Sequence, residues 1–184
     1  ELKEYIAFNN SSYLSPHLHG GIQNQNLHST DANVEYVIVV HPEFITSAQR
    51  LAQLHLERSN LKSIIVTPEQ IYNEFSSGSQ DVSAIRDFLR MLYKKPESQL
   101  KYLLLFGDGS YDPKERVINN TNFIPTYQSQ NSTHPIYSYV TDDYFALLDD
   151  DEGLFNNTDQ VDIGVGRFPV TTLNQADVLV KKVE

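Results

Sequence analysis

The chain has 184 residues, 40% of them hydrophobic and 21% charged, a length and balance that fit one soluble globular domain with a substantial core. Fourteen basic against 24 acidic residues give a formal net charge of −10, which disfavours binding to nucleic acid or to an anionic lipid surface. Cysteine is absent, which excludes a disulfide, a thiolate metal site and a cysteine nucleophile within these residues, and no apolar run approaches the about 20 residues of a membrane span.

Residues 1–33 predict an irregular lead-in or linker. The stretch from residue 9 to residue 33 is rich in Asn, Ser, His and Gly and has little periodicity, and only Tyr5 to Phe8 suggests a short strand. The first residues are neither a signal peptide nor a lipidation motif, and the last ones are typical of the middle of a helix. We therefore expect a piece of a longer protein, with an α/β subdomain over residues 34–184.

From residue 34 onward, apolar runs alternate with helical patterns. Three runs predict strands that are buried on both faces of a parallel sheet: 34–40, 62–66 and 101–106. Between them the sequence predicts helices that begin at Thr46 or Ser47, at the capping box Thr67-Pro68-Glu69-Gln70, and after Asp81.

The third strand runs into a glycine-rich turn, Gly107-Asp108-Gly109-Ser110-Tyr111-Asp112-Pro113. Beyond it, residues 114–160 predict long loops with a possible strand at 123–127, residues 161–168 alternate like a strand, and Thr172 to Gln175 predicts a second capping box before a helix. Alternating strands and helices specify right-handed crossovers. The predicted fold class is therefore α/β, a three-layer arrangement with a mostly parallel sheet of about four strands and helices on both faces.

The glycine-rich turn is a weak candidate for a ligand site. It has the first two glycines of a dinucleotide fingerprint but Asp112 at the third position, and no Gly-Lys-Ser or Gly-Lys-Thr exists in the chain. Ser110 also lacks the flanking glycines of a nucleophile elbow. A tight turn after a buried strand is the simpler interpretation, although Asp108 could still point into a site at this edge of the sheet.

An acidic cluster follows, made of Asp142, Asp143, Asp149, Asp150, Asp151 and Glu152. Asp149, Asp151 and Glu152 are candidate calcium ligands, because a hard cation offsets the repulsion of crowded carboxylates. The spacing is not that of an EF-hand loop, and a solvated acidic turn is the simpler interpretation. No cofactor is required by any motif, so calcium is the one candidate.

The six histidines are scattered and predict no catalytic base. His17 and His19 sit in an irregular segment with no cysteine or predicted helix nearby to fix metal geometry. His41 follows the first strand and so lies at the carboxyl edge of the sheet, but a surface histidine in a turn is far commoner than a general base.

Three segments in series resemble the gingipain family of cysteine peptidases: residues 102–112 (YLLLFGDGSYD), 139–145 (YVTDDYF) and 163–169 (IGVGRFP). Within that family the likeness is to the PorU-like sortases of the type IX secretion system, because Asp-Asp-Tyr-Phe is followed by Leu-Leu-Asp-Asp-Asp-Glu-Gly. The resemblance covers about residues 34 to 184.

This resemblance implies the N-terminal subdomain of a caspase-like fold, in which two subdomains lie side by side and the second carries a His and Cys pair. Both would lie beyond residue 184, and His19-Gly20 comes too early to be the family's His-Gly motif. The family's third residue, an acid that orients the histidine, is matched by Asp143, with Asp142 as its neighbour. The chain alone is then expected to be inactive.

By the same resemblance, the expected partners are the second half of the peptidase domain, a protein or peptide substrate and components of type IX secretion. The expected location is the extracellular or outer-membrane surface of a Gram-negative bacterium. Two other readings stay open. One is a self-standing α/β module that binds a small ligand, metal or protein between residues 107–113 and 142–153. The other is a degenerate family member with a structural role.

Overall fold

An all-parallel sheet organises the fold in the computed structural model, which describes residues 3–9, 11, 13–18, 20–114, 116–131, 133–155 and 158–184. Within these residues the sheet has four strands in the order β2-β1-β3-β6. The strands are β1 (Tyr36–Val40), β2 (Ser63–Val66), β3 (Tyr102–Phe106) and β6 (Gly164–Phe168). The predicted fold class is confirmed, because the chain crosses back between successive strands and all of them run in one direction.

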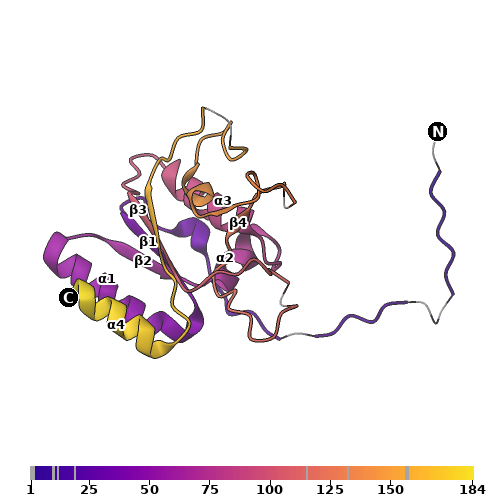
Figure 1. Cartoon of the computed structure of the whole chain (residues 1–184), viewed down its shortest axis with the longest axis horizontal. Coiled ribbons are helices and arrows are strands. Elements are labelled where there is room, and N and C mark those ends of the chain that lie inside the picture. The colour runs from indigo at the N-terminus through magenta and orange to yellow at the C-terminus, as the bar shows by residue number, and fades with distance from the viewer. Residues whose placement is uncertain are drawn as a thin grey trace.

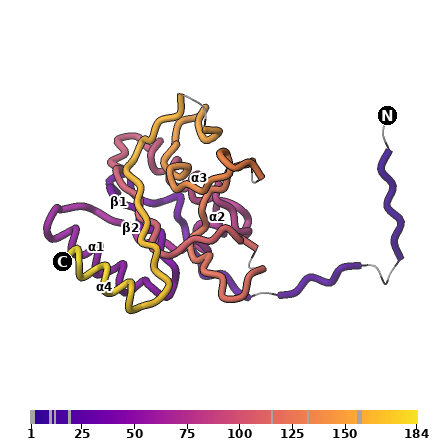
Figure 2. Tube along the Cα trace, viewed as in Figure 1, coloured from indigo at the N-terminus to yellow at the C-terminus, as the bar shows by residue number. Residues whose placement is uncertain are grey.

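Helices cover both faces of this sheet (Figure 1). Helices α1 (Ile45–Ser59) and α4 (Leu173–Val183) lie side by side on one face. Helices α2 (Pro68–Phe75) and α3 (Val82–Tyr93) lie on the other face (Figures 1 and 2). Arg50 joins α1 to the end of α4 by donating to Asp177 at 3.2 Å and to Glu184 at 2.7 Å.

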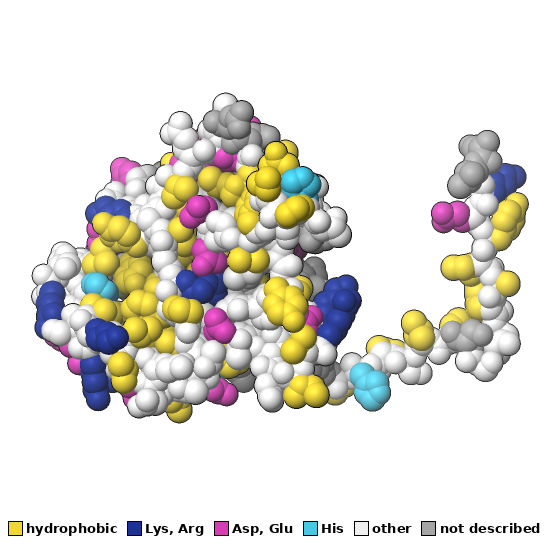
Figure 3. Space-filling view, viewed as in Figure 1, with side chains coloured by type: hydrophobic (Ala, Val, Ile, Leu, Met, Phe, Trp, Pro, Cys, Tyr) yellow, Lys and Arg dark blue, Asp and Glu magenta, His cyan; other side chains and the backbone are white. Residues whose placement is uncertain are grey.

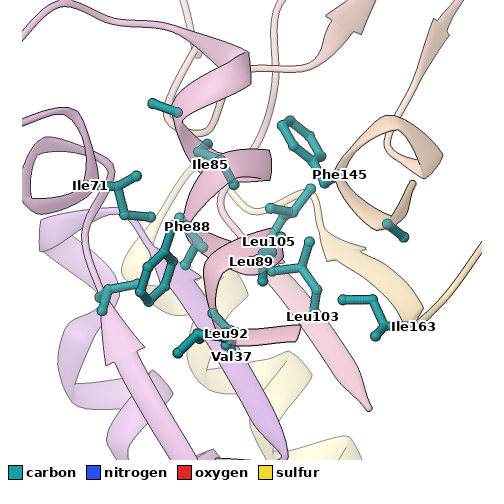
Figure 4. Packing of buried hydrophobic residues seen from close by; sticks show 14 of the residues in the cluster. Val37, Ile71, Ile85, Phe88, Leu89, Leu92, Leu103, Leu105, Phe145 and Ile163 are labelled. Atoms are coloured by element: carbon teal, nitrogen blue, oxygen red, sulfur yellow. The ribbon is translucent and has the colours of Figure 1, made fainter. Parts of the chain in front are cut away.

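Alternating strand residues divide the core between the two layers, as the period of two in a strand requires. Val37, Leu103 and Leu105 point toward α2 and α3, where they meet Phe88 and other apolar side chains of α3 (Figure 4). The intervening residues, such as Ile38 and Leu104, pack under α1 and α4. The β-strands are therefore apolar on both sides because each side has its own helical layer.

Two of the predicted helix starts form as expected. The side chain of Thr67 accepts from the Gln70 N–H while Gln70 Oε1 accepts from the Thr67 N–H, which completes the capping box of α2. Asp81 caps α3 by accepting from the Ser83 N–H at 2.8 Å. Both caps satisfy amide groups that the first helical turn leaves without partners.

The starts of α1 and α4 differ from the prediction. Helix α1 begins one residue before Thr46, because the 3-10 helix η2 (Pro42–Phe44) runs directly into it and leaves no side-chain cap. The Ser47 hydroxyl donates to Asp177 of α4 instead, at 2.8 Å. At α4, Thr172 accepts from the Gln175 N–H as predicted, but Gln175 Oε1 accepts from the Thr171 N–H, so the reciprocal half of the box is shifted by one residue.

Short elements fill the region beyond the carboxyl ends of the strands. Strands β4 (Tyr127–Gln128) and β5 (Val140–Thr141) form an antiparallel pair, and the 3-10 helix η3 (Asp143–Ala146) follows directly. The strand predicted at 123–127 is thus reduced to its last residue and the next one. The buried Phe145 anchors η3 in the core beside α3 and β3 (Figure 4).

The N-terminal part combines an extended arm with a short packed segment. The described residues before Gly21 are in no sheet, so the strand predicted at Tyr5 to Phe8 does not form, and hydrophobic side chains recur along the arm in the space-filling view (Figure 3). The 3-10 helix η1 (Leu27–Ser29) packs against α2, with Leu27 only 8% exposed. Within the described parts of the chain, no helix combines the length and apolar composition that crossing a bilayer requires.

Candidate functional site

The carboxyl ends of β1, β3 and β6 meet at one edge, where open α/β sheets place their ligand sites. A loop formed by residues 121–127 packs across this edge. Gly107 permits the packing, because a Cβ there would lie 3.0 Å from Ile124 Cγ1 and 3.1 Å from Phe123 Cβ, and its φ of +154° is unfavourable for a side chain. The glycine-rich turn is therefore explained by close backbone approach rather than by a phosphate.

Arg167, in β6, holds three segments of this edge together. Its Nε and Nη2 donate to the two carboxylate oxygens of Asp142 at 2.8 and 2.7 Å. Its Nη1 donates to the carbonyls of Gly107 and Ile124 at 3.0 and 2.9 Å, and Nη2 also donates to Pro125 O at 3.1 Å. Every N–H of the guanidinium thus has a partner, and the side chain is only 11% exposed.

The adjacent carboxylates Asp142 and Asp143 have different surroundings. Both oxygens of Asp142 accept from Arg167, and its side chain is 23% exposed. Asp143 is exposed, and its backbone N–H donates to Thr141 Oγ1 at 3.1 Å, while its carboxylate accepts from none of the residues that the structure describes. Asp143, the acid predicted to orient a histidine, is therefore the one of the two whose carboxylate faces outward.

Asp108 and Asp112 shape the turn after β3 rather than facing solvent freely. Asp108 Oδ2 accepts from the Thr121 hydroxyl at 2.6 Å, which ties the turn to the 121–127 loop. Asp112 is 7% exposed and accepts from the backbone N–H groups of Lys114 and Val117 at 3.3 and 2.7 Å. Asp112 is therefore buried against local donors, whereas Asp108 is half-buried, and its role in a site at this edge stays a prediction.

His41 lies at the same edge, after β1. Its ring stacks on Phe123 at a centroid distance of 4.2 Å, and its Nδ1 is buried without a partner among the described residues. Burial lowers the pKa of this imidazole, although Glu43 opposes the shift. Stacking on an aromatic ring is consistent with a packing role for His41, and its non-catalytic role stays a prediction.

The acidic loop after η3 is held by basic side chains from α3. Arg86 donates to the carbonyls of Leu147 and Glu152 at 2.5 and 2.9 Å, and Arg90 and Lys94 both pair with Asp150. These contacts offset part of the repulsion among the carboxylates of the loop.

Of the candidate calcium ligands, Asp149 and Glu152 come together with Asp162, with oxygens within 4.8 Å of one another, while Asp151 is outside that group. The oxygens of Asp162 already accept from Leu148 N at 2.7 Å and Tyr93 Oη at 3.1 Å. The sequence had not indicated Asp162, because it is ten residues beyond Glu152 and precedes a strand. Calcium binding stays a prediction.

The other histidines have contacts elsewhere, lie on the arm or are outside the described residues. His28 Nδ1 lies 2.8 Å from Glu74 Oε2, His55 packs on Tyr36, and His134 accepts from two local N–H groups. His17 lies on the extended arm, and His19 lies outside the described residues. In the described portion, no histidine hydrogen-bonds to Asp143.

Comparison with known proteins identifies the family. The model of peptidase family C25 matches residues 29–184. The crystal structure of dimeric latent PorU from Porphyromonas gingivalis is similar over 94% of this chain, with 36% identity and a TM-score of 0.78. The Arg-specific cysteine proteinase gingipain R (RgpB) is similar over 83% of the chain, with a TM-score of 0.59 and 16% identity, a likeness that shows the fold alone. No curated protein sequence matches.

The chain spans only part of these relatives, covering 17% of the PorU chain and 28% of the gingipain R chain. The match to the family model nevertheless includes the whole parallel sheet and all four α-helices of the described residues. The resemblance inferred from the three sequence segments is confirmed. This chain belongs to peptidase family C25, the gingipain family, and forms part of a peptidase domain.

Proposed function

We propose that this chain is the N-terminal subdomain of a cysteine peptidase and that it supplies Asp143 as the acid that orients the catalytic histidine. One observation carries this proposal. Of the two adjacent carboxylates at the carboxyl edge of the sheet, both oxygens of Asp142 accept hydrogen bonds from Arg167, whereas Asp143 is exposed. An acid that must accept from an incoming imidazole needs this second arrangement.

The chemistry assigned to Asp143 is electrostatic. A carboxylate that accepts from one imidazole nitrogen fixes the tautomer of the ring and stabilises the imidazolium. The other imidazole nitrogen then takes the thiol proton, and the thiolate attacks a peptide carbonyl. Because the chain contains no cysteine, the thiolate has to come from another part of the protein, and we expect the 184-residue chain to be inactive alone.

The remainder of the peptidase domain is the first partner that we propose. Strand β6 has β3 on one side and no described strand on its other side. Gly164 and Gly166 are exposed on it, and beside them lies an open hollow of about 550 Å³ that is also lined by Tyr36, Tyr102 and Leu104. An apolar, side-chain-poor surface of this kind suits a covering protein segment.

The 36% identity to PorU supports a more specific proposal for the whole protein. We propose a sortase of the type IX secretion system, acting on the outer-membrane surface of a Gram-negative bacterium. Its substrate would be a carboxy-terminal sorting domain, which it cleaves before it transfers the cargo to surface lipopolysaccharide. Components of that secretion system would then be further partners.

Replacement of Asp143 in the full-length protein tests the core of the proposal. We expect Asp143→Asn to lower cleavage of fluorescently labelled casein by about 10²–10⁴-fold, because Asn leaves the histidine without its charged partner. The melting temperature should be unchanged, since Asp143 is exposed. Asp87→Asn, an exposed carboxylate on α3, is the matched control and should keep full activity.

Casein is a general peptidase substrate, so an assay that labels the catalytic cysteine directly should accompany the cleavage assay. Iodoacetamide alkylates a cysteine as its thiolate, and its rate as a function of pH reports the thiolate–imidazolium pair without any need for peptide turnover. Asp143→Asn should move the alkaline limb of this profile to lower pH, because the imidazolium loses its stabilising carboxylate. An Asp143→Asn protein with unchanged turnover and an unchanged profile would contradict the proposal.

A further inference from the structure

Arg167, 25 positions beyond Asp142 in the chain, decides which of the two aspartates is available. Arg167 is in β6. Its Nε and Nη2 donate to different oxygens of the Asp142 carboxylate, and this bidentate pairing fixes the orientation of that carboxylate. The same guanidinium is fixed by three backbone carbonyls, from Gly107, Ile124 and Pro125. Asp142 is therefore pinned to the sheet and cannot swing outward without breaking two charge-assisted hydrogen bonds.

Asp143 lies between two residues that are held in place, Asp142 before it and Tyr144 after it. On the far side, Tyr144 is 8% exposed and its hydroxyl lies 3.1 Å from Ser83 Oγ, while Phe145 is fully buried. The Phe145 N–H also donates to Asp142 O at 3.1 Å, which closes the first turn of η3. With the backbone held on both sides, the Asp143 carboxylate is presented from a rigid support, as a catalytic acid requires.

The ion pair between Arg167 and Asp142, called the clamp from here on, also has an electrostatic consequence. Asp142 and Asp143 are neighbours, and two free carboxylates at one edge would both compete for an imidazole proton. By neutralising Asp142, Arg167 leaves Asp143 as the single carboxylate of this pair that is open to an incoming group. A lysine would keep the positive charge but could not satisfy the same fork of acceptors.

We propose that Arg167, acting through Asp142, is a positioning residue that sets the place and the identity of the histidine-orienting acid. The inference rests on the proposed function of Asp143. It assigns no direct contact between Arg167 and the substrate, so its effect should be felt in the catalytic step and not in substrate binding.

The test uses the full-length protein and three variants: Arg167→Lys, Asp143→Asn and the double variant. Arg167→Lys should lower kcat for labelled casein by about 10- to 100-fold with KM little changed, because a displaced acid weakens the step that it assists. Its iodoacetamide profile should show an alkaline limb moved to lower pH, in the same direction as Asp143→Asn. The double variant should be no slower than Asp143→Asn, since the clamp acts only through that acid.

Two further variants separate positioning from simple loss of stability. Arg50 also pairs with two carboxylates, but it does so between α1 and the end of α4. Arg50→Lys weakens these ion pairs and should leave kcat and the pH profile unchanged. Asp142→Asn keeps the size of the side chain and removes its charge, so it serves if Arg167→Lys does not fold. Asp142→Asn should give the same shift of the alkaline limb, because it removes the charged acceptor of the two hydrogen bonds from Arg167.

The outcomes distinguish the two ideas. If Asp143→Asn leaves the pH profile unchanged, the proposed function fails, and the clamp fails with it. If Asp143→Asn shifts the profile but Arg167→Lys and Asp142→Asn reduce activity equally at every pH, Arg167 only stabilises the fold and the inference is overturned. A shared shift, with no added loss in the double variant, supports both.

Discussion

At the scale of single residues, the packing at the carboxyl edge of the sheet requires glycine at position 109. A Cβ at Gly109 would lie 2.5 Å from Thr126 Cγ2, 3.2 Å from Ile124 O and 3.3 Å from Arg167 Nη1. The contact with a backbone carbonyl and with the Arg167 fork leaves little room to relax. The same glycine therefore supports both the loop at 121–127 and the clamp on Asp142.

Replacement of Gly109 should consequently destabilise the fold. We expect Gly109→Ala to lower the free energy of unfolding by about 1–3 kcal/mol, the usual cost of adding a methyl group where no space exists. Urea unfolding of the variant and the parent chain measures the difference. Gly166→Ala is the matched control, because a Cβ there meets nothing within 4 Å, and it should be neutral or slightly stabilising. Equal stability of both variants would contradict the steric argument.

The two aspartates show how far the sequence alone can reach at this scale. Asp142 and Asp143 are adjacent and chemically identical, and the family resemblance points to the pair more firmly than to either member. Their environments differ because of Arg167, which is 25 positions beyond Asp142 in the sequence and which only the pairing of β6 with β3 brings to the same edge. Non-local pairing of this kind leaves no local signature, although Arg167 lies within 163–169, one of the three segments on which the resemblance rests.

At the scale of elements, one carboxylate attaches the N-terminal segment to the body of the molecule. Glu74 in α2 accepts from the N–H groups of Leu27 and His28, from Gln25 Nε2 and from the ring of His28. Burial alone would raise the pKa of Glu74, but these donors outweigh it and lower the pKa to about 2. The ionised carboxylate is therefore what holds η1 against α2.

This contact predicts a pH dependence with a definite sign. The pKa of Glu74 in the folded protein, about 2, is below its ordinary value of 4.5, so the stabilisation is complete above pH 4.5 and is lost as the pH falls from 4.5 through 2. Glu74→Gln mimics the protonated form at every pH. Near neutral pH, Glu74→Gln should lower the free energy of unfolding by about 1.5–3 kcal/mol, the range for hydrogen bonds to a charged group.

Urea unfolding of both proteins at several pH values checks this prediction. The gap between them should narrow below pH 4.5, because the wild-type carboxylate becomes protonated while the Gln side chain does not titrate. Glu69→Gln, in the first turn of the same helix, is a control with an exposed carboxylate and should show no comparable gap. A gap for Glu74→Gln that stays constant with pH would show that the charge of Glu74 is not what attaches the segment.

The accuracy of the sequence-based predictions followed the physical basis of each element. The four strands of the parallel sheet and helices α2 and α3 were placed well, since continuous apolar runs and side-chain caps are local signals. The start of α1 was wrong because η2 runs into it, which no cap residue marks. Of the pair β4 and β5, only Tyr127 fell within a predicted strand. Each of these strands has two residues, and their pairing depends on tertiary contacts such as Tyr127 stacking on Tyr144 at 4.4 Å.

At the scale of the whole molecule, the arm and the β6 edge of the sheet are two exposed surfaces of the described residues. The arm carries Tyr5, Ile6 and Leu14 at 85, 87 and 97% exposure, and it extends away from the body in Figures 1 and 2. Strand β6 has one unpaired side, and its exposed glycines leave the backbone open to close approach. The edge is the better defined of the two, because the rest of the molecule holds it rigidly.

If the remainder of the peptidase domain covers β6, backbone amides that the chain alone exposes should become protected. The Gly164 N–H donates to Lys101 O, so by the alternation of a parallel ladder the N–H groups of Val165 and Arg167 point away from β3. We expect hydrogen exchange at Val165 to be at least about tenfold slower in the full-length protein than in the 184-residue chain, as burial suppresses local opening. Leu103, in the central strand β3, should exchange slowly in both and shows that the chain alone is folded. Fast exchange at Val165 in both proteins, with Leu103 protected in both, would mean that the second half of the domain packs elsewhere.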